Sequence, residues 1–199
     1  MYLTITHKTE LAFVESKSKF IGILFPCPHL DAFKAELANV KNTYPNASHY
    51  CSAGIFGNPF SHRSSDDGEP SGSAGNPMLG QLRAANLVNV ACIVVRYYGG
   101  TKLGVPGLIK SYKAACFQAI EQTERIPFVK KNILEIRGNY EMLMRFYSKN
   151  HKKGWEMKTL TLASEMVIHA LLEAEAMEDF KNNLTLFPLL EFDVVPENQ

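Results

Sequence analysis

Apolar and aromatic side chains alternate with polar ones over residues 11–27, which is a pattern typical of β-strands. Ser16-Lys17-Ser18 would turn the chain between two strands, and Pro26 would end the second because proline cannot donate to a sheet ladder. Residues 30–41 instead repeat with the period of an amphipathic helix, and residues 49–56 predict a third strand. The apolar face of the helix consists of Phe33, Leu37 and Val40.

Residues 57–75 follow neither period and consist largely of glycine, proline, serine, aspartate and asparagine. A structureless stretch of this length is uncommon in a compact domain, and it is usually functional where it occurs. We therefore expect a long loop that ends where Asn76 caps a helix and Pro77 occupies the first turn. That helix should end near residues 87–89, before a buried strand at 90–95.

A longer helix should begin near Gly104 or Val105, since Pro106 is tolerated in a first turn. Lys110 and Lys113 lie three positions apart on one face of it, where they can act together. The opposite, apolar stripe consists of Leu108, Tyr112, Ala115, Cys116 and Ala119.

Pro127 is the expected boundary between two domains, 1–127 and 128–199. Beyond it the predicted elements follow the order strand, helix, strand, strand, helix, strand. This order predicts an α+β fold whose second domain is a ferredoxin-like βαββαβ sandwich, with a hairpin turn near 163–165. The strands should cover 131–137, 156–162, 166–172 and 189–195, and the helices 140–148 and 175–184.

The composition is that of a globular protein of 199 residues, with 46% apolar and 21% charged side chains. The longest apolar run lies within residues 90–95, far short of the roughly 20 residues that span a bilayer. No secretory leader pattern is present, so we expect a cytoplasmic protein without a membrane partner. The four cysteines are far apart and form no Cys-x-x-Cys pair, which favours reduced, buried thiols over disulfides or a zinc site.

Basic residues are unevenly distributed, although the formal net charge is only +1. Residues 70–120 contain no carboxylate but do contain five basic side chains. Such a segment could contact an anion or a phosphate, and the alternative is ordinary solvated charge. The five side chains are those of Arg83, Arg96, Lys102, Lys110 and Lys113.

Ten of the thirteen glycines lie between Gly54 and Gly107, where the backbone must adopt unusual conformations or approach other groups closely. Gly-Gly-Thr-Lys-Leu-Gly at 99–104 precedes a helix, as phosphate-binding loops do. It matches neither a P-loop nor the Gly-x-Gly-x-x-Gly fingerprint. Anion contact by Lys102 and nearby amides is therefore favoured over nucleotide hydrolysis, and a turn required only for packing is the alternative.

The Asp-Asp-Gly-Glu sequence at 66–69 offers oxygen ligands for a hard cation, and His62 could add a nitrogen. The same residues are ordinary turn formers. We favour a third interpretation, in which the carboxylates pair with basic side chains and fix the long loop to the end of a strand. No metal ion is then expected. The candidate basic partners are Arg63, Arg96 and Lys102.

Catalytic patterns are weak in this sequence. Ser71 and Ser73 lie among glycines but not in a Gly-x-Ser-x-Gly elbow. His49 and Cys51 would face the same side of a strand, without the geometry that defines a general base. We therefore expect no catalytic residue and no cofactor.

The two glycine-rich segments together resemble the signature of the IMPACT/YigZ family. The first is Asp-Asp-Gly-Glu-Pro-Ser-Gly-Ser-Ala-Gly at 66–75, and the second is Arg-Tyr-Tyr-Gly-Gly-Thr-Lys-Leu-Gly at 96–104. Ser18-Lys19-Phe20 is similar to the N-terminal motif of that family, whereas Pro106 stands where a glycine is usual. The signature residues are Asp66, Asp67, Gly68, Glu69, Pro70, Gly72, Gly75, Gly99, Gly100 and Gly104.

The resemblance implies a first domain similar to the second domain of a small-subunit ribosomal protein and to domain IV of elongation factor G. It also implies a ferredoxin-like second domain similar to domain V of that factor. Eukaryotic members regulate a translation-control kinase, and bacterial members have no settled biochemical activity. A link to translation is therefore expected from family and fold, not from residue spacing.

The leading hypothesis is a non-enzymatic protein that binds RNA or the ribosome, with basic side chains on phosphates and tyrosines stacked on bases. One alternative is a regulatory module that holds a protein partner through the acidic loop and the second sheet. Another is a metal-dependent hydrolase that uses residues 66–69. The residues expected to contact nucleic acid or another anion are Lys19, Arg63, Arg96, Tyr97, Tyr98, Lys102, Lys110 and Lys113.

Overall fold

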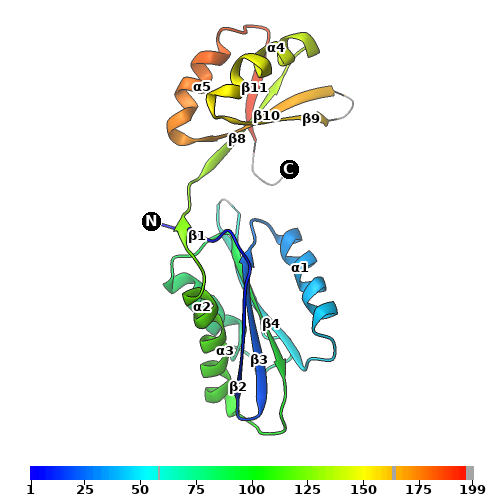
Figure 1. The fold of residues 1–199 in the computed structure, drawn as a ribbon, viewed down its shortest axis with the longest axis vertical. Coiled ribbons are helices and arrows are strands. Elements are labelled where there is room, and N and C mark those ends of the chain that lie inside the picture. The colour runs from blue at the N-terminus through cyan, green and yellow to red at the C-terminus, as the bar shows by residue number, and fades with distance from the viewer. Residues whose placement is uncertain (58, 163–164, 196–199) are drawn as a thin grey trace. The chain divides into compact units, whose positions relative to one another are not determined.

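The computed structural model describes residues 1–57, 59–162 and 165–195 (Figure 1). The chain forms two compact units, Met1–Phe128 and Val129–Gln199. Both units contain helices and strands, so the predicted α+β fold class is confirmed. No helix within the described ranges is both long and apolar enough to cross a membrane.

The first unit is built around a central strand that is buried on both faces. Its strands are β1 (Leu3–Thr4), β2 (Thr9–Glu15), β3 (Ser18–Pro26), β4 (His49–Phe56), β5 (Ser61–Ser65), β6 (Val90–Tyr97) and β7 (Ile126–Pro127). In the described part of this unit, an antiparallel sheet has the order β2-β3-β6-β4-β5, and β1 pairs with β7. β6 is the middle strand, which explains its unbroken apolar run.

Helices pack on both faces of this sheet (Figure 1). They are α1 (Leu30–Thr43), α2 (Gly75–Ala84) and α3 (Gly104–Glu121). Successive residues of β3 point to opposite faces, so Phe20 joins the core under α2 and α3 while Ile21 joins the core under α1. Tyr112 of α3 is fully buried in the first of these cores.

The prediction that residues 57–75 contain no regular structure was wrong in part, because strand β5 lies within this range. Ser61–Ser65 pair with β4 in antiparallel register, with His62 opposite Ile55. All the side chains of β5 are exposed, so the strand carries no apolar alternation that could reveal it. β5 lies at the edge of the sheet, where polar side chains discourage pairing with other chains.

The bounds of α2 also differ from the prediction. The helix begins at Gly75, with Ala74 and not Asn76 at the N-cap position, and it ends at Ala84 instead of near 87–89. Asn86 has a φ of 54°, a left-handed conformation that cannot continue a helix. The predicted start of α3 at Gly104 is confirmed.

The second unit contains elements in the order predicted from the sequence, from strand to helix through to the last strand. They are β8 (Lys131–Arg137), α4 (Tyr140–Asn150), β9 (Glu156–Leu162), β10 (Glu165–Glu173), α5 (Met177–Leu184) and β11 (Glu191–Val195). The sheet is antiparallel with the order β11-β8-β10-β9. Both helices cover one face of it, where Phe146 and Phe180 pack on Leu134 and Ile168.

Several bounds in this unit shift by a few residues. α5 begins at Met177 because Ala174–Ala176 form a short 3-10 helix, and β11 begins at Glu191, two residues after the predicted start. β8 and β9 have the predicted bounds. The predicted hairpin turn near 163–165 includes residues outside the described ranges.

Candidate functional site

The carboxylate of Asp66 organises the acidic loop from within. Its Oδ1 accepts hydrogen bonds from the N–H groups of Ala74 at 3.0 Å and Gly75 at 2.8 Å, and its Oδ2 accepts one from Gly72 at 2.8 Å. Amides at a helix start lack intrahelical partners, so Asp66 performs the capping expected of Asn76. Partial burial raises the pKa of Asp66, but the backbone donors together outweigh it and hold the pKa below its usual range.

Asp67 connects the same loop to the start of β4. Its Oδ2 accepts a hydrogen bond from the backbone N–H of Tyr50 at 2.7 Å, and its carbonyl oxygen lies 2.8 Å from Nδ1 of His49. A carbonyl can only accept, so Nδ1 of His49 carries the hydrogen in this contact. Nε2 of the same ring lies 3.8 Å from Oε1 of Glu69.

Glu69 and Arg96 form a buried ion pair beneath the loops. Nη1 of Arg96 donates to Oε1 of Glu69 at 2.6 Å, and the hydroxyl of Tyr112 donates to the same oxygen at 2.8 Å. Nη2 of Arg96 donates to Oγ of Ser18 at 3.3 Å. The side chains of Glu69 and Arg96 are only 3% and 5% exposed. This is the internal pairing that was favoured from the sequence, with Arg96 as the partner.

Gly99 brings the second glycine-rich loop against the turn between β2 and β3. Its N–H donates to Oγ of Ser18 at 3.3 Å, so this hydroxyl accepts from both Gly99 and Arg96. A Cβ at position 99 would lie 1.8 Å from the carbonyl oxygen of Lys17, a distance that no side chain can occupy. Positive φ angles are found at the signature residues Gly68, Gly72, Gly100 and Gly104.

A pocket of about 490 Å³ lies between the two loops and the first turn of α3. The buried Glu69–Arg96 pair forms its inner polar part, and Leu103, Val105 and Leu108 supply apolar surface. The Tyr98 ring lines it as well and is 46% exposed. The guanidinium carbon of Arg96 lies 5.5 Å from the centroid of that ring, within the range of a cation–π interaction.

The first turn of α3 contributes free amides to this pocket. Leu103 at the N-cap position makes no side-chain hydrogen bond, and the first turn contains no acidic residue. The unpaired N–H groups and the helix dipole therefore favour an anion here. Pro106 has no N–H and the N–H of Gly107 belongs to the first intrahelical hydrogen bond, so the free donors that line the pocket are those of Gly104 and Val105. Exposed Lys102 lines the same pocket.

A family model described as the Impact N-terminal domain matches residues 16–120, which is more than half of the chain and includes every residue that lines the pocket. The chain belongs to the IMPACT family. It is 33% identical to an IMPACT family member from Haemophilus influenzae over 185 residues, which cover 89% of each chain. It is 42% identical to YigZ from Escherichia coli over 109 residues, or 53% of each chain.

More distant relatives extend the similarity over nearly the whole chain. The IMPACT family member YvyE from Bacillus subtilis is 28% identical over 185 residues, which cover 92% of this chain and 85% of YvyE. A crystal structure described as that of a hypothetical protein matches with a TM-score of 0.77 and 28% identity, over 99% of this chain and 98% of that one. The resemblance inferred from the sequence motifs is thus confirmed.

Three of the residues expected to contact an anion line the pocket of this IMPACT family protein, namely Arg96, Tyr98 and Lys102. Arg96 is buried in its ion pair, so its guanidinium does not face solvent. Tyr97 is partly buried and its hydroxyl donates to the carbonyl oxygen of Pro45 at 3.0 Å.

The other expected residues lie elsewhere on the first unit. Lys19 is exposed on β3, opposite Tyr97 in the register. Lys110 and Lys113 are exposed on α3, and Arg63 is exposed on the edge strand β5. The pocket lining includes none of these four.

Some site residues were missed from the sequence. Ser18 belongs to the N-terminal family motif, but nothing in that motif marks its hydroxyl as an acceptor for two distant groups. Tyr112 fits the apolar stripe of α3 and was assigned to the core, where its hydroxyl nevertheless finds Glu69. Leu103 and Val105 were missed because an aliphatic side chain does not by itself indicate a binding site.

The alternative chemistries find little support in the geometry. No cluster of three or more His, Cys, Asp or Glu residues that could hold a metal ion occurs among the described residues. The Cys51 thiol donates to the carbonyl oxygen of Asp66 at 2.9 Å, and burial raises its pKa to about 12. Cys51 is therefore a neutral thiol near pH 7, not a thiolate nucleophile.

Proposed function

We propose that this protein is a cytoplasmic, non-enzymatic protein that binds single-stranded RNA, free or exposed on the ribosome, in the pocket between its glycine-rich loops. The observation that carries the proposal is the position of the exposed Tyr98 ring beside Lys102 and the uncapped start of α3. A base can stack on the tyrosine while the neighbouring phosphate meets the lysine and the helix amides. We call this cavity the RNA pocket.

Charge within the pocket supports one orientation of the RNA. Arg96 balances the only carboxylate of the described lining, Glu69, and both are buried. The remaining charge at the exposed surface is that of Lys102, so a phosphate belongs on the side of α3. The imidazole of His49 and the hydroxyl of Ser48 line the opposite part and can form hydrogen bonds with a base edge.

The fold assignments inferred from the family remain part of the proposal. We infer that the second unit is a ferredoxin-like domain, which its strand order and its two helices on one sheet face support. We likewise infer that the first unit has the fold of domain IV of elongation factor G. The link to translation rests on this analogy.

Binding of a short fluorescent single-stranded RNA at several salt concentrations tests the proposal. Lys102→Gln should weaken binding and reduce the slope of log K against log salt by about 0.7, the share of one phosphate contact. Lys34→Gln, on the exposed face of α1, is the matched control and should leave the slope unchanged. The proposal is wrong if the wild-type protein shows no salt-sensitive binding or if the two variants behave alike.

A further inference from the structure

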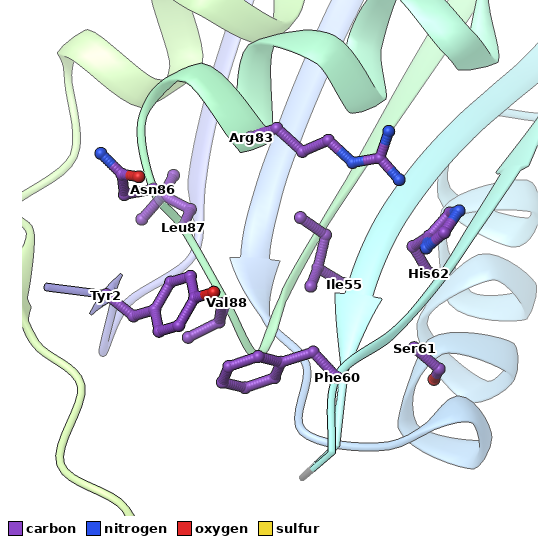
Figure 2. Close-up of a pocket in the computed structure, with 9 residues that line it drawn as sticks. All are labelled: Tyr2, Ile55, Phe60, Ser61, His62, Arg83, Asn86, Leu87 and Val88. Atoms are coloured by element: carbon purple, nitrogen blue, oxygen red, sulfur yellow. The ribbon is translucent and has the colours of Figure 1, made fainter.

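A second pocket of about 330 Å³ lies at the opposite end of β4 and β6 from the RNA pocket (Figure 2). Its inner surface is made by Ile55, Leu87 and Val88, which are buried in the core under α2. Phe60 and Tyr2 extend this surface outward, with their rings edge to face at 5.0 Å. The volume lies in the range of small-molecule sites, and the lining combines this apolar surface with polar groups.

The polar residues around this second pocket are cationic or neutral. Arg83 comes from the last turn of α2 and His62 from β5, and no carboxylate is among the lining residues of the described chain. His62 is paired with Ile55 across the sheet, so both side chains lie on the same face. Figure 2 shows Arg83 extending over Ile55 toward His62.

Arg83 is free to bind a ligand. Within the described residues, the arginines that form ion pairs are Arg96, Arg125 and Arg137, and Arg83 is not one of them. A guanidinium presents a planar fork of donors that matches a carboxylate or a phosphate group. An unpaired fork above an apolar surface is therefore complementary to a molecule that is anionic at one end and apolar at the other.

We propose that this pocket binds a small aromatic acid, whose anionic group contacts Arg83 and His62 and whose ring packs on Phe60 and Ile55. Offset or edge-to-face packing against the Phe60 and Tyr2 rings favours an aromatic body over an aliphatic one. The anionic group can be a carboxylate or a phosphate, since the N–H donors of the Arg83 guanidinium can bind the oxygens of either. The proposal is independent of RNA binding because no residue lines both pockets.

The full chain is titrated with phenylacetate and with phenyl phosphate while backbone amide signals are followed by NMR. We expect saturable shifts at residues 60–62 and 83–88 with at least one of the two acids, and the tighter of them identifies the anionic group. Benzyl alcohol and inorganic phosphate, which each supply half of the ligand, should bind at least about tenfold more weakly. If benzyl alcohol binds as tightly as the preferred acid, the inferred contact of the anionic group with Arg83 is wrong.

Arg83→Gln should weaken binding of the preferred acid at least about tenfold, because one charge-assisted contact is lost. Arg83 is exposed and unpaired among the described residues, so this variant is expected to fold as the wild type does. Arg125→Gln and Lys34→Gln remove the same charge elsewhere and should leave the affinity unchanged. The proposal is lost if neither acid shifts these amides or if Arg83→Gln binds as tightly as the controls.

Discussion

Oε1 of Glu69 and Nη1 of Arg96 lie 2.6 Å apart, although the residues are 27 positions apart in the sequence. Glu69 belongs to the acidic loop and Arg96 to the end of β6, so each glycine-rich segment supplies one member of the pair. Because both side chains are almost fully buried, the position of one segment determines the position of the other.

Glu69→Gln should destabilise the first unit by about 3–5 kcal/mol, because it leaves the buried Arg96 without a compensating charge. Glutamine keeps the size of the side chain, so packing is conserved. The free energy of unfolding is measured in urea. Glu36→Gln breaks the more exposed pair with Lys8 in the same unit and should cost at most about 1 kcal/mol. If both variants lose the same free energy of unfolding, burial does not make the Glu69–Arg96 pair more important for stability than the exposed pair.

Acid should weaken the first unit through Asp66. The pKa of Asp66 is depressed in the folded state, so its ionised form contributes stability above the unfolded pKa of about 3.9. That contribution is lost as the pH falls below this value and through the folded pKa. In urea unfolding at a series of pH values, Asp66→Asn should be less stable than the wild type at neutral pH, and the difference should shrink toward about pH 3. A difference that does not change with pH would count against this role.

Gly99→Ala should destabilise the protein or displace the loop, because its Cβ would lie 1.8 Å from the backbone oxygen of Lys17. Gly80→Ala provides the opposite case, since nothing lies within 4 Å of a Cβ at that exposed helix position. Alanine there should stabilise α2 by roughly 0.5–1 kcal/mol. Thermal unfolding of the two variants should shift in opposite directions, and a Gly99→Ala variant with wild-type stability and RNA affinity would refute the close contact.

Tyr98→Ala should weaken RNA binding by about 1–3 kcal/mol, the usual contribution of one stacked base. Tyr98→Phe should retain most of the affinity, because the ring and not the hydroxyl makes the contact. Tyr140→Ala, which removes an even more exposed ring from the second unit, is the matched control. Anisotropy titrations in which Tyr98→Phe and Tyr98→Ala lose the same affinity would exclude stacking.

The cysteines should not react with a thiol reagent in the folded protein. All four are free and buried, as their spacing suggested. Burial raises the pKa of Cys27 and Cys51 to about 12, so neither supplies thiolate at mildly alkaline pH. Labelling with an aromatic disulfide should be slow in buffer and complete in urea. Fast labelling of the native protein would show that one of these sites opens.

The sequence predicted elements well where apolar periodicity was strong. β6 and α3 are examples, because a fully buried strand and a long amphipathic helix both leave clear patterns. β5 could not be found in this way, since Ser61–Ser65 bury no side chain and pair with β4 through the backbone. The start of α2 was misplaced because its cap comes from Asp66 and not from the adjacent Asn76.

The site was predicted in outline but not in its pairings. An ion pair between the acidic loop and a basic residue was expected, yet Arg63, Arg96 and Lys102 were equally suitable partners in the sequence. The choice of Arg96 depends on which strand ends beneath the loop, and that is a property of the sheet order. The second pocket was invisible for the same reason, because its lining comes from separate segments between Tyr2 and Val88.

The central position of β6 has a consequence for hydrogen exchange. Its amides pair with β3 and β4 and are covered on both faces, so they should exchange only when the whole first unit unfolds. Arg96 is part of this strand, whereas Lys102 lies in the loop between β6 and α3. The inner part of the RNA pocket therefore belongs to the most protected strand of the unit, and any conformational entropy that the protein loses on binding a ligand should come mainly from the loop at 99–103.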